Sequence, residues 1–325
     1  MADFSFDRSL LRYEDAEVRP SQGPYKPHDP SIHVFSDGKR TLGYVTANHE
    51  KGLESQTFQV IAQAFENNPP EFVIIESIES GRGISPEFMV REGKLQAVDG
   101  FKKVGEPVYT AYLAAKKNIP FSGGEPSEEE LFKGMRELGY SDKEMMAYRW
   151  QEAIMDGVKN GELNEANFDK KTREYFQSAR FSFLPPDERM TPEEFKGWFA
   201  QHDATGKTAL EIKSEDMAPK RGGAASYLQT MSADSGDIRE HHLAGVVEHA
   251  LQDHKNVLVV YGWGHFEKAR PMYEQALPNH EETIPKARSA VDAGISHDVD
   301  YNDLGHFSAQ LGASRNRGGA RGRGA

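Results

Sequence analysis

The chain has no cysteine among its 325 residues. Disulfide bonds, thiolate metal ligands and a cysteine nucleophile are therefore excluded. It also lacks any apolar run that approaches the roughly 20 residues of a membrane-spanning helix. Residues 1–20 contain no basic segment followed by an apolar one, so we expect no cleaved signal peptide. These absences predict a soluble protein without a membrane span, which stays in the cytoplasm or is exported without a cleaved signal.

Positive charge is in the minority, with 39 lysine and arginine residues against 51 aspartate and glutamate residues and a net charge of -12. A surface of that sign repels nucleic acids and anionic membranes. The exception is the C-terminal end, ASRNRGGARGRGA, where four arginines stand among small residues. Contact with nucleic acid is therefore expected only through this basic tail.

Three regions of the chain differ in composition. Residues 1–30 mix four prolines with charges and are expected to form an N-terminal arm. Residues 31–290 carry a succession of apolar and amphipathic segments, long enough for one domain with a sizeable core. Residues 291–325 are rich in serine, aspartate, glycine and finally arginine, which predicts a flexible tail. We therefore expect a single domain between an arm and a tail.

The first part of this domain shows the pattern of a strand pair followed by a helix and a strand. Residues 33–35 and 41–45 are apolar and predict two strands of a hairpin, because Asp-Gly within residues 36–38 favours a tight reversal. Apolar residues at helical spacing predict a helix over 58–65. The continuous apolar run 72–75 is typical of a strand that is covered on both faces.

The same alternation continues to the end of the domain. Residues 109–117 predict a helix, and residues 119–123 a short strand. Residues 127–215 are rich in Glu, Lys, Met and aromatic residues, and we interpret them as a helical insertion. A helix is expected over 238–251 and a strand over 257–261. The predicted fold is α/β, with a mostly parallel central sheet flanked by helices.

Polar residues stand where the predicted strands end. His49, Glu76 and Glu125 each follow an apolar run, and His265 follows the strand over 257–261 through a glycine-rich turn. Arg239 is expected at the start of the helix that precedes that strand. In open α/β sheets, ligands bind at the carboxyl ends of the strands. We therefore expect these five side chains to converge in one pocket.

Some of these side chains also have a purely structural interpretation. Glu76 would pair with Arg82, and Arg239 would pair with Asp237 or Glu240 on a helix surface. The two interpretations differ in geometry. A functional centre requires all five side chains to share one concave site, whereas structural roles leave them dispersed.

The arrangement resembles the superfamily that joins TraB, Tiki, erythromycin esterases and ChaN-like proteins. Five segments carry the resemblance, and they are Thr41–His49, Phe72–Glu76, Ala114–Glu125, Asp237–Glu240 and Gly262–His265. They correspond to the first Gly-x-x-His element, two strands that end in glutamate, the arginine element and the second Gly-x-x-His element. Their order and spacing matter more than any single segment.

One residue departs from the family pattern. The first element reads Thr46-Ala-Asn-His49, with threonine in place of glycine. Because glycine permits close approach of backbone or ligand, the exchange either narrows the site beside His49 or is tolerated there.

The resemblance implies hydrolysis of an amide or ester bond in a small-molecule or peptide substrate. Two mechanisms fit the residues. In the first, His49 and His265 bind a divalent transition metal (Zn, Mn or Co) with Glu76 or Glu125, and the metal activates water. In the second, His49 is oriented by a carboxylate and acts as general base on water, while His265 and Arg239 stabilise the tetrahedral intermediate.

The resemblance also implies alternatives from another class. ChaN-like members bind haem, so a non-catalytic or haem-binding module with the same residues is one of them. A bacterial effector that acts on host cells through the same cleft is another.

Overall fold

The computed structural model describes residues 4–11, 29–79, 86–203, 205–223 and 225–284. The predicted tail over 291–325 and most of the predicted arm over 1–30 lie outside these residues. The described part of the arm packs on the domain, where Phe6 and Leu11 join the core beside α8 and α9. No helix in the described ranges combines the length and the hydropathy that a membrane-spanning segment needs.

The described residues form a six-stranded mixed sheet in the order β4-β3-β5-β2-β1-β6. The strands are β1 (Ser31–Ser36), β2 (Thr41–Ala47), β3 (Phe72–Glu79), β4 (Phe121–Glu125), β5 (Asn256–Gly262) and β6 (Asn279–Thr283). The four strands β4, β3, β5 and β2 are parallel, whereas β1 runs antiparallel to both β2 and β6. The predicted α/β fold with a mostly parallel sheet is confirmed.

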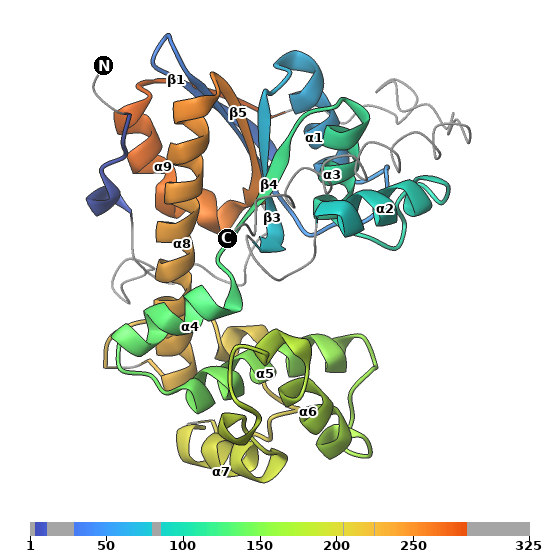
Figure 1. Cartoon of the computed structure of the whole chain (residues 1–325), viewed down its shortest axis with the longest axis vertical. Helices are drawn as coiled ribbons and strands as arrows, with labels where there is room; N and C mark the ends of the chain where they lie inside the picture. Colours follow the sequence, from blue (N-terminus) through green and yellow to red (C-terminus); the bar gives the residue numbers. More distant parts are fainter. Residues whose placement is uncertain (1–3, 12–28, 80–85, 204, 224, 285–325) are drawn as a thin grey trace, which may run out of the picture.

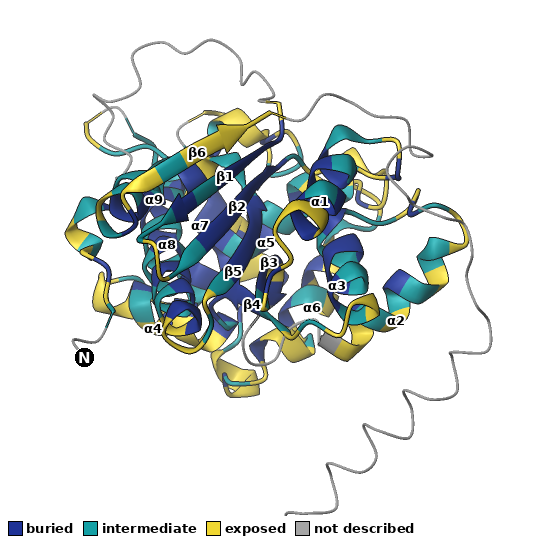
Figure 2. Ribbon diagram, turned by 90° about the horizontal axis from the view of Figure 1, so that it is seen from above, coloured by how far each residue is buried: buried dark blue, intermediate teal, exposed yellow. Residues whose placement is uncertain are grey.

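The hairpin predicted at the start of the domain is present. β1 and β2 pair from Ser31 opposite Thr46 to Ser36 opposite Thr41. Gly38 in the turn has a φ of 83°, a left-handed conformation that glycine adopts without steric cost. The last strand, β6, was not expected. It forms the exposed edge of the sheet beside β1, and its residues NHEET carry no apolar pattern (Figure 2).

Helices cover both faces of the sheet (Figures 1 and 2). One face packs against α1 (Gln56–Asn67), α2 (Pro86–Ala97) and α3 (Glu106–Lys116). The other packs against α8 (Tyr227–Asp253) and α9 (Trp263–Ala276). Because both faces are covered, β3 is buried over residues 73–76 and β5 over residues 257–261, and their sequences are continuously apolar over residues 72–75 and 257–261.

The connection that follows β5 crosses the opposite face of the sheet from the connections that follow its neighbours. After β2 it enters α1 on one face of the sheet, whereas after β5 it enters α9 on the opposite face. Because β5 lies between β2 and β3, neighbouring strands send their connections to opposite faces at this point. Such a switch point opens the carboxyl edge of a parallel sheet to ligands. His49, which follows β2, and His265, which follows β5, both lie at this edge.

The predicted insertion is a helical unit with a core of its own. It contains α4 (Glu128–Glu137), α5 (Asp142–Lys159), α6 (Phe168–Phe176) and α7 (Pro192–His202). Capping boxes at Ser127, Ser141 and Thr191 start three of these helices. The core also takes Leu228 and Met231 from the first turns of α8, so the unit continues beyond residue 215. It faces the carboxyl edge of the sheet (Figure 1).

Short 3₁₀ helices complete the described structure. They are Arg8–Leu10, Ala179–Phe181, Pro186–Glu188 and Ser214–Asp216.

Strand β3 does not end at Glu76, as its sequence suggested, but continues to Glu79. Its pairing with β4 shifts register between Ile75 and Glu79, and Ser77 has a φ of 62°. Such an irregularity re-aims neighbouring side chains and is common beside functional sites. Glu76 therefore lies within the strand, at the irregularity itself.

The irregularity depends on a glycine of the neighbouring strand. A Cβ added to Gly123 would lie 1.7 Å from the carbonyl oxygen of Ile78. We expect Gly123→Ala to lower the free energy of unfolding by about 1 to 3 kcal/mol, the usual cost of overpacking. The matched control is Gly197→Ala, in an exposed part of α7 with no atom within 4 Å of the added Cβ. It should be neutral or stabilising by up to about 1 kcal/mol. Urea denaturation of both variants measures the difference, and equal stabilities would contradict the prediction.

Candidate functional site

The five predicted site residues come from five different elements. His49 follows β2, Glu76 lies in β3, and Glu125 is the last residue of β4. Arg239 lies in α8, and His265 lies in the first turn of α9. The positions of Glu76 and Glu125 within strands correct the expectation that both follow strand ends. Arg239 is in the middle of α8 and not at its start, because that helix begins at Tyr227.

Glu76 connects His265 to the sheet. Its Oε2 accepts a hydrogen bond of 2.7 Å from the backbone N–H of Gly262, and its Oε1 lies 3.6 Å from Nε2 of His265. Both side chains are largely buried, with 8% of Glu76 and 16% of His265 exposed. The structural alternative for Glu76 involved Arg82, which lies outside the described residues.

Glu125 and Arg239 are partners of each other. The guanidinium donates from Nε and Nη2 to the two carboxylate oxygens of Glu125, both at 2.7 Å. Burial would raise the pKa of Glu125, but the charge and hydrogen bonds of Arg239 outweigh it and hold this pKa at about 2. Arg239 therefore does not pair with Asp237 or Glu240, as its structural interpretation assumed. Such a two-pronged ion pair fixes the guanidinium beside the sheet edge.

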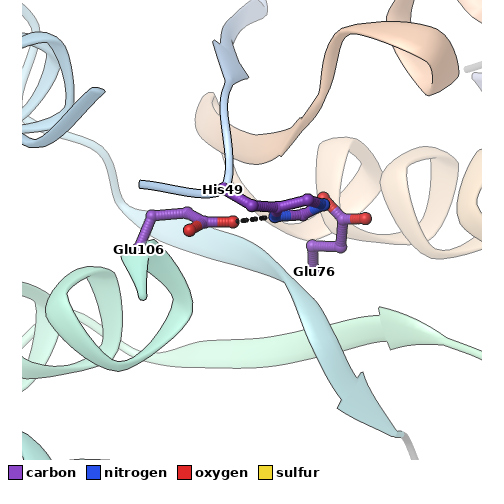
Figure 3. Close-up of side chains that lie close together, drawn as sticks. All are labelled: His49, Glu76 and Glu106. Carbon is purple, nitrogen blue, oxygen red and sulfur yellow. Dashed lines mark hydrogen bonds and ion pairs between the residues drawn. The ribbon is translucent and has the colours of Figure 1, made fainter. Parts of the chain in front are cut away.

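His49 has a carboxylate partner that the sequence analysis did not identify. Its Nδ1 lies 2.6 Å from Oε1 of Glu106, the first residue of α3 (Figure 3). The two side chains differ in exposure, at 70% for His49 and 3% for Glu106. The hydrogen bond with Glu106 raises the pKa of His49 to about 9, and the nearby charge of Glu76 acts in the same direction. The only sequence signal for Glu106 was its place before Pro107 at a helix start, where acidic residues are common anyway.

The two histidines belong to one site through Glu76. Ligand atoms of His49, Glu76 and Glu106 lie within 4.8 Å of one another, and Glu76 also lies beside His265. The charges of Glu76 and Arg239 act on both imidazoles, and that of His265 acts on Glu125. All five predicted residues thus share one electrostatic environment.

The residues grouped closely enough to hold a metal ion differ from the predicted set. The sequence analysis predicted His49 and His265 as ligands, together with Glu76 or Glu125. Among the described residues, the close group is His49, Glu76 and Glu106 (Figure 3). His265 is not part of this group, although its Nε2 lies 3.6 Å from Oε1 of Glu76. The close group thus shares His49 and Glu76 with the predicted ligand set and contains Glu106 in addition.

Glu240 is a second acidic residue that the sequence analysis missed as a site residue. It is 2% exposed and lies next to Arg239 on α8. Its Oε1 accepts from Nδ1 of His265 and lies 3.7 Å from Nζ of Lys268. Burial alone would lower the pKa of His265, but the charge and hydrogen bond of Glu240 raise it above the usual value.

Thr46, which stands where the superfamily that the sequence resembles has glycine, is accommodated in the sheet. Thr46 is 1% exposed, and its hydroxyl accepts a hydrogen bond of 2.9 Å from the backbone N–H of Ser31 on β1. The side chain therefore serves the pairing of β1 with β2.

Comparisons with known proteins identify no relative. No family model matches the chain, and neither a curated protein nor a solved structure matches it. The resemblance to the TraB and Tiki superfamily thus remains a prediction from the sequence, and the arguments below rest on the geometry of the site.

Proposed function

We propose that the protein is a hydrolase of the TraB, Tiki and erythromycin esterase type, which cleaves an amide or ester bond with an activated water. The observation that carries the proposal is the pair of His49 and Glu106 beside Glu76, at the sheet edge where the topology switches. An exposed imidazole held by a buried carboxylate is the arrangement of a general base and its orienting partner.

His49 removes the proton from water in this mechanism. Glu106 binds Nδ1, which leaves Nε2 of the exposed ring to face the substrate side. Glu106 also stabilises the imidazolium that forms when the proton is taken. Glu76, within 4.8 Å of His49, accepts a hydrogen bond from the attacking water. This assignment keeps the predicted role of His49 and names its carboxylate.

The developing oxyanion is stabilised by the two cationic groups on the other side of Glu76. His265 presents Nε2 toward Glu76, and Arg239 is held in place by Glu125. Arg239 uses Nε and Nη2 for that pair, and 32% of its side chain is exposed, so in this mechanism Nη1 donates to the ligand. Fixed donors aimed at developing charge lower the barrier because they need no reorganisation.

His49, Glu76 and Glu106 also fit a divalent transition metal. One imidazole and two carboxylates are a ligand set that suits Zn, Mn or Co, and the ligand atoms are near enough to share an ion. When bound, such a metal lowers the pKa of a coordinated water to about 7. A metal ion has to displace the proton from His49. Because the pKa of His49 is about 9, this competition weakens metal binding at neutral pH.

Hydrolysis of a panel of p-nitrophenyl esters and peptide p-nitroanilides tests the proposal. We expect turnover of at least one class by the purified full chain, with a loss of about 100-fold or more in His49→Ala. His249→Ala, at an exposed histidine of α8, is the matched control and should retain activity. The same assay after dialysis against EDTA and after Mn or Zn addition separates the two ways of activating water. Equal activity of His49→Ala and the control would refute the proposal.

The pH dependence distinguishes the role of His49. A general base must be unprotonated, so we expect kcat/KM without metal to rise about tenfold per pH unit and to level off above about pH 9. Glu106→Gln removes the carboxylate charge that raises the pKa of His49. The rise of kcat/KM in this variant should therefore occur at a pH about 1 to 3 units lower than in the wild type. Stopped assays of hydrolysis at pH 5 to 10 measure the pH profiles of kcat/KM for the wild type and for Glu106→Gln. A rate that falls through pH 9 would instead make His49 an acid.

A further inference from the structure

The helical unit contains a cavity that the proposed site does not use. Its volume is about 630 Å³, within the range of roughly 300 to 1,000 Å³ that is typical of small-molecule pockets. The cavity lies between the first turn of α6, one side of α7 and the segment 206–210. In Figure 1, α6 and α7 lie on the side of the unit that is turned away from the sheet. The cavity is therefore separate from the candidate functional site.

The apolar part of the cavity wall consists of the phenylalanines Phe168, Phe195 and Phe199. The ring of Phe195 is fully buried, and its centroid lies 6.1 Å from that of Phe168 and 6.1 Å from that of Phe199. Two small residues, Ala200 and Gly206, also line the cavity, and a Cβ added to Gly206 would meet no atom within 4 Å. Aromatic rings behind small residues leave room for an apolar or ring-shaped ligand body.

The lysines that line the cavity already face carboxylates. Nζ of Lys196 lies 2.6 Å from Asp169, and Nζ of Lys207 donates to both oxygens of Asp216 at 2.6 and 2.7 Å. The third, Lys170, lies 3.9 Å from a glutamate of its own helix. Asp169 also stands in the first turn of α6, where it offsets the positive end of that helix. An anionic ligand would therefore compete with carboxylates of the chain for these positive charges.

Two further carboxylates of the cavity wall remain for a ligand. Asp203 follows the last residue of α7, and the carbonyl groups at the end of a helix favour a cation. Burial would raise the pKa of Asp203, but hydrogen bonds from Thr205 and its neighbours hold this pKa below its usual value. Asp203 is therefore ionised at neutral pH. Glu165 is exposed and has no ion-pair partner within the described part of the chain.

We propose that this cavity binds an organic cation, with its apolar body on the three phenylalanines and its ammonium group at Asp203 and Glu165. The faces of aromatic rings attract cations, so both parts of the cavity wall favour the same ligand. The net charge of -12 also favours the approach of a cation to the protein. This inference does not depend on the proposed hydrolysis, because no residue of the cavity belongs to that site.

Fluorescence titration of the full chain with berberine, a flat aromatic cation, tests whether the cavity is the binding site. We expect saturable binding with a Kd of about 10 to 100 µM. Ala200→Leu fills part of the cavity and should weaken binding about tenfold or more. Ala179→Leu, at an exposed alanine of the same unit outside the cavity wall, is the matched control and should bind like the wild type. Absence of saturable binding, or equal affinities of the two variants, would overturn the inference.

The preference for a cation is tested separately. Asp203→Asn keeps an acceptor for Thr205 but removes the charge, and the affinity for berberine should fall about 3- to 10-fold. Asp187→Asn, at an exposed aspartate outside the cavity wall, should leave it unchanged. The difference between these variants should shrink at high salt.

The aromatic anion 8-anilinonaphthalene-1-sulfonate gives the opposite charge on a similar body, and it should bind the wild type about tenfold more weakly than berberine. Tighter binding of this anion, or an unchanged affinity of Asp203→Asn for berberine, would refute the cation site. Circular dichroism checks the folding of each variant. If Ala200→Leu does not fold, the comparison of Asp203→Asn with Asp187→Asn still decides.

Discussion

Replacing His265 by Asn is expected to reduce kcat by about 100- to 1,000-fold, the usual effect of removing one oxyanion donor. Asparagine is chosen because its amide can still donate to Glu240, as Nδ1 of His265 does, but it cannot reach toward Glu76. Alanine would leave the buried carboxylate of Glu240 without its closest partner, and its effect would mix stability with catalysis.

The control for this variant is His249→Asn, at an exposed histidine of α8 that forms an ion pair with Asp253 on the same helix. Both variants should show the circular dichroism spectrum and melting temperature of the wild type within a few degrees. Full activity of a folded His265→Asn variant would remove His265 from the mechanism, whatever the result for His49.

Replacing Arg239 by Met is expected to lower the free energy of unfolding by about 3 to 5 kcal/mol at pH 7, because it leaves the buried carboxylate of Glu125 unpaired. Glu125 is 11% exposed and is held by both of its oxygens. The matched control is Arg270→Met, which breaks a comparable but exposed pair with Glu274 and should cost less than about 1 kcal/mol.

The same variant has a defined pH dependence. With Arg239 present, the pKa of Glu125 is lowered from 4.5 to about 2, so the pair stabilises the fold above pH 4.5 and loses this contribution as the pH falls toward 2. Without Arg239, burial favours the neutral carboxyl. The destabilisation of Arg239→Met should therefore shrink between pH 7 and pH 3. Urea denaturation at both pH values measures it, and a constant difference would show that Arg239 acts through packing alone.

The buried strands were predictable because their sequences follow directly from their environment. Phe72–Ile75 and Val257–Tyr261 are covered on both faces, and a strand in that position is apolar at every residue. β6 was missed for the converse reason. At the exposed edge of the sheet, its residues NHEET need no apolar side chains, so no pattern marks the strand.

The histidines of the site were predictable, whereas their carboxylate partners were not. His49 and His265 stand beside strand ends, where position along one strand is sufficient to place them. Glu106 is 57 residues from His49, and only the packing of α3 brings the two together. Glu240 was hidden by the helix boundary. If α8 began at Ile238, Glu240 would lie in an exposed first turn.

Helix α8 runs unbroken from the core of the helical unit into the core on the face of the sheet that it covers with α9. Its first turns supply Leu228 and Met231 to the helical unit, and its last turns supply Val247 and Leu251 to the layer on the sheet. Arg239 lies between these two sets of residues, so its orientation depends on the packing at both ends of α8. A molecule that binds the helical unit and rotates it would therefore also rotate α8 about its axis and move the side chain of Arg239. Excision of residues 127–215 would leave Leu228 and Met231 without most of the core in which they pack, and would thereby loosen the part of α8 that carries Arg239.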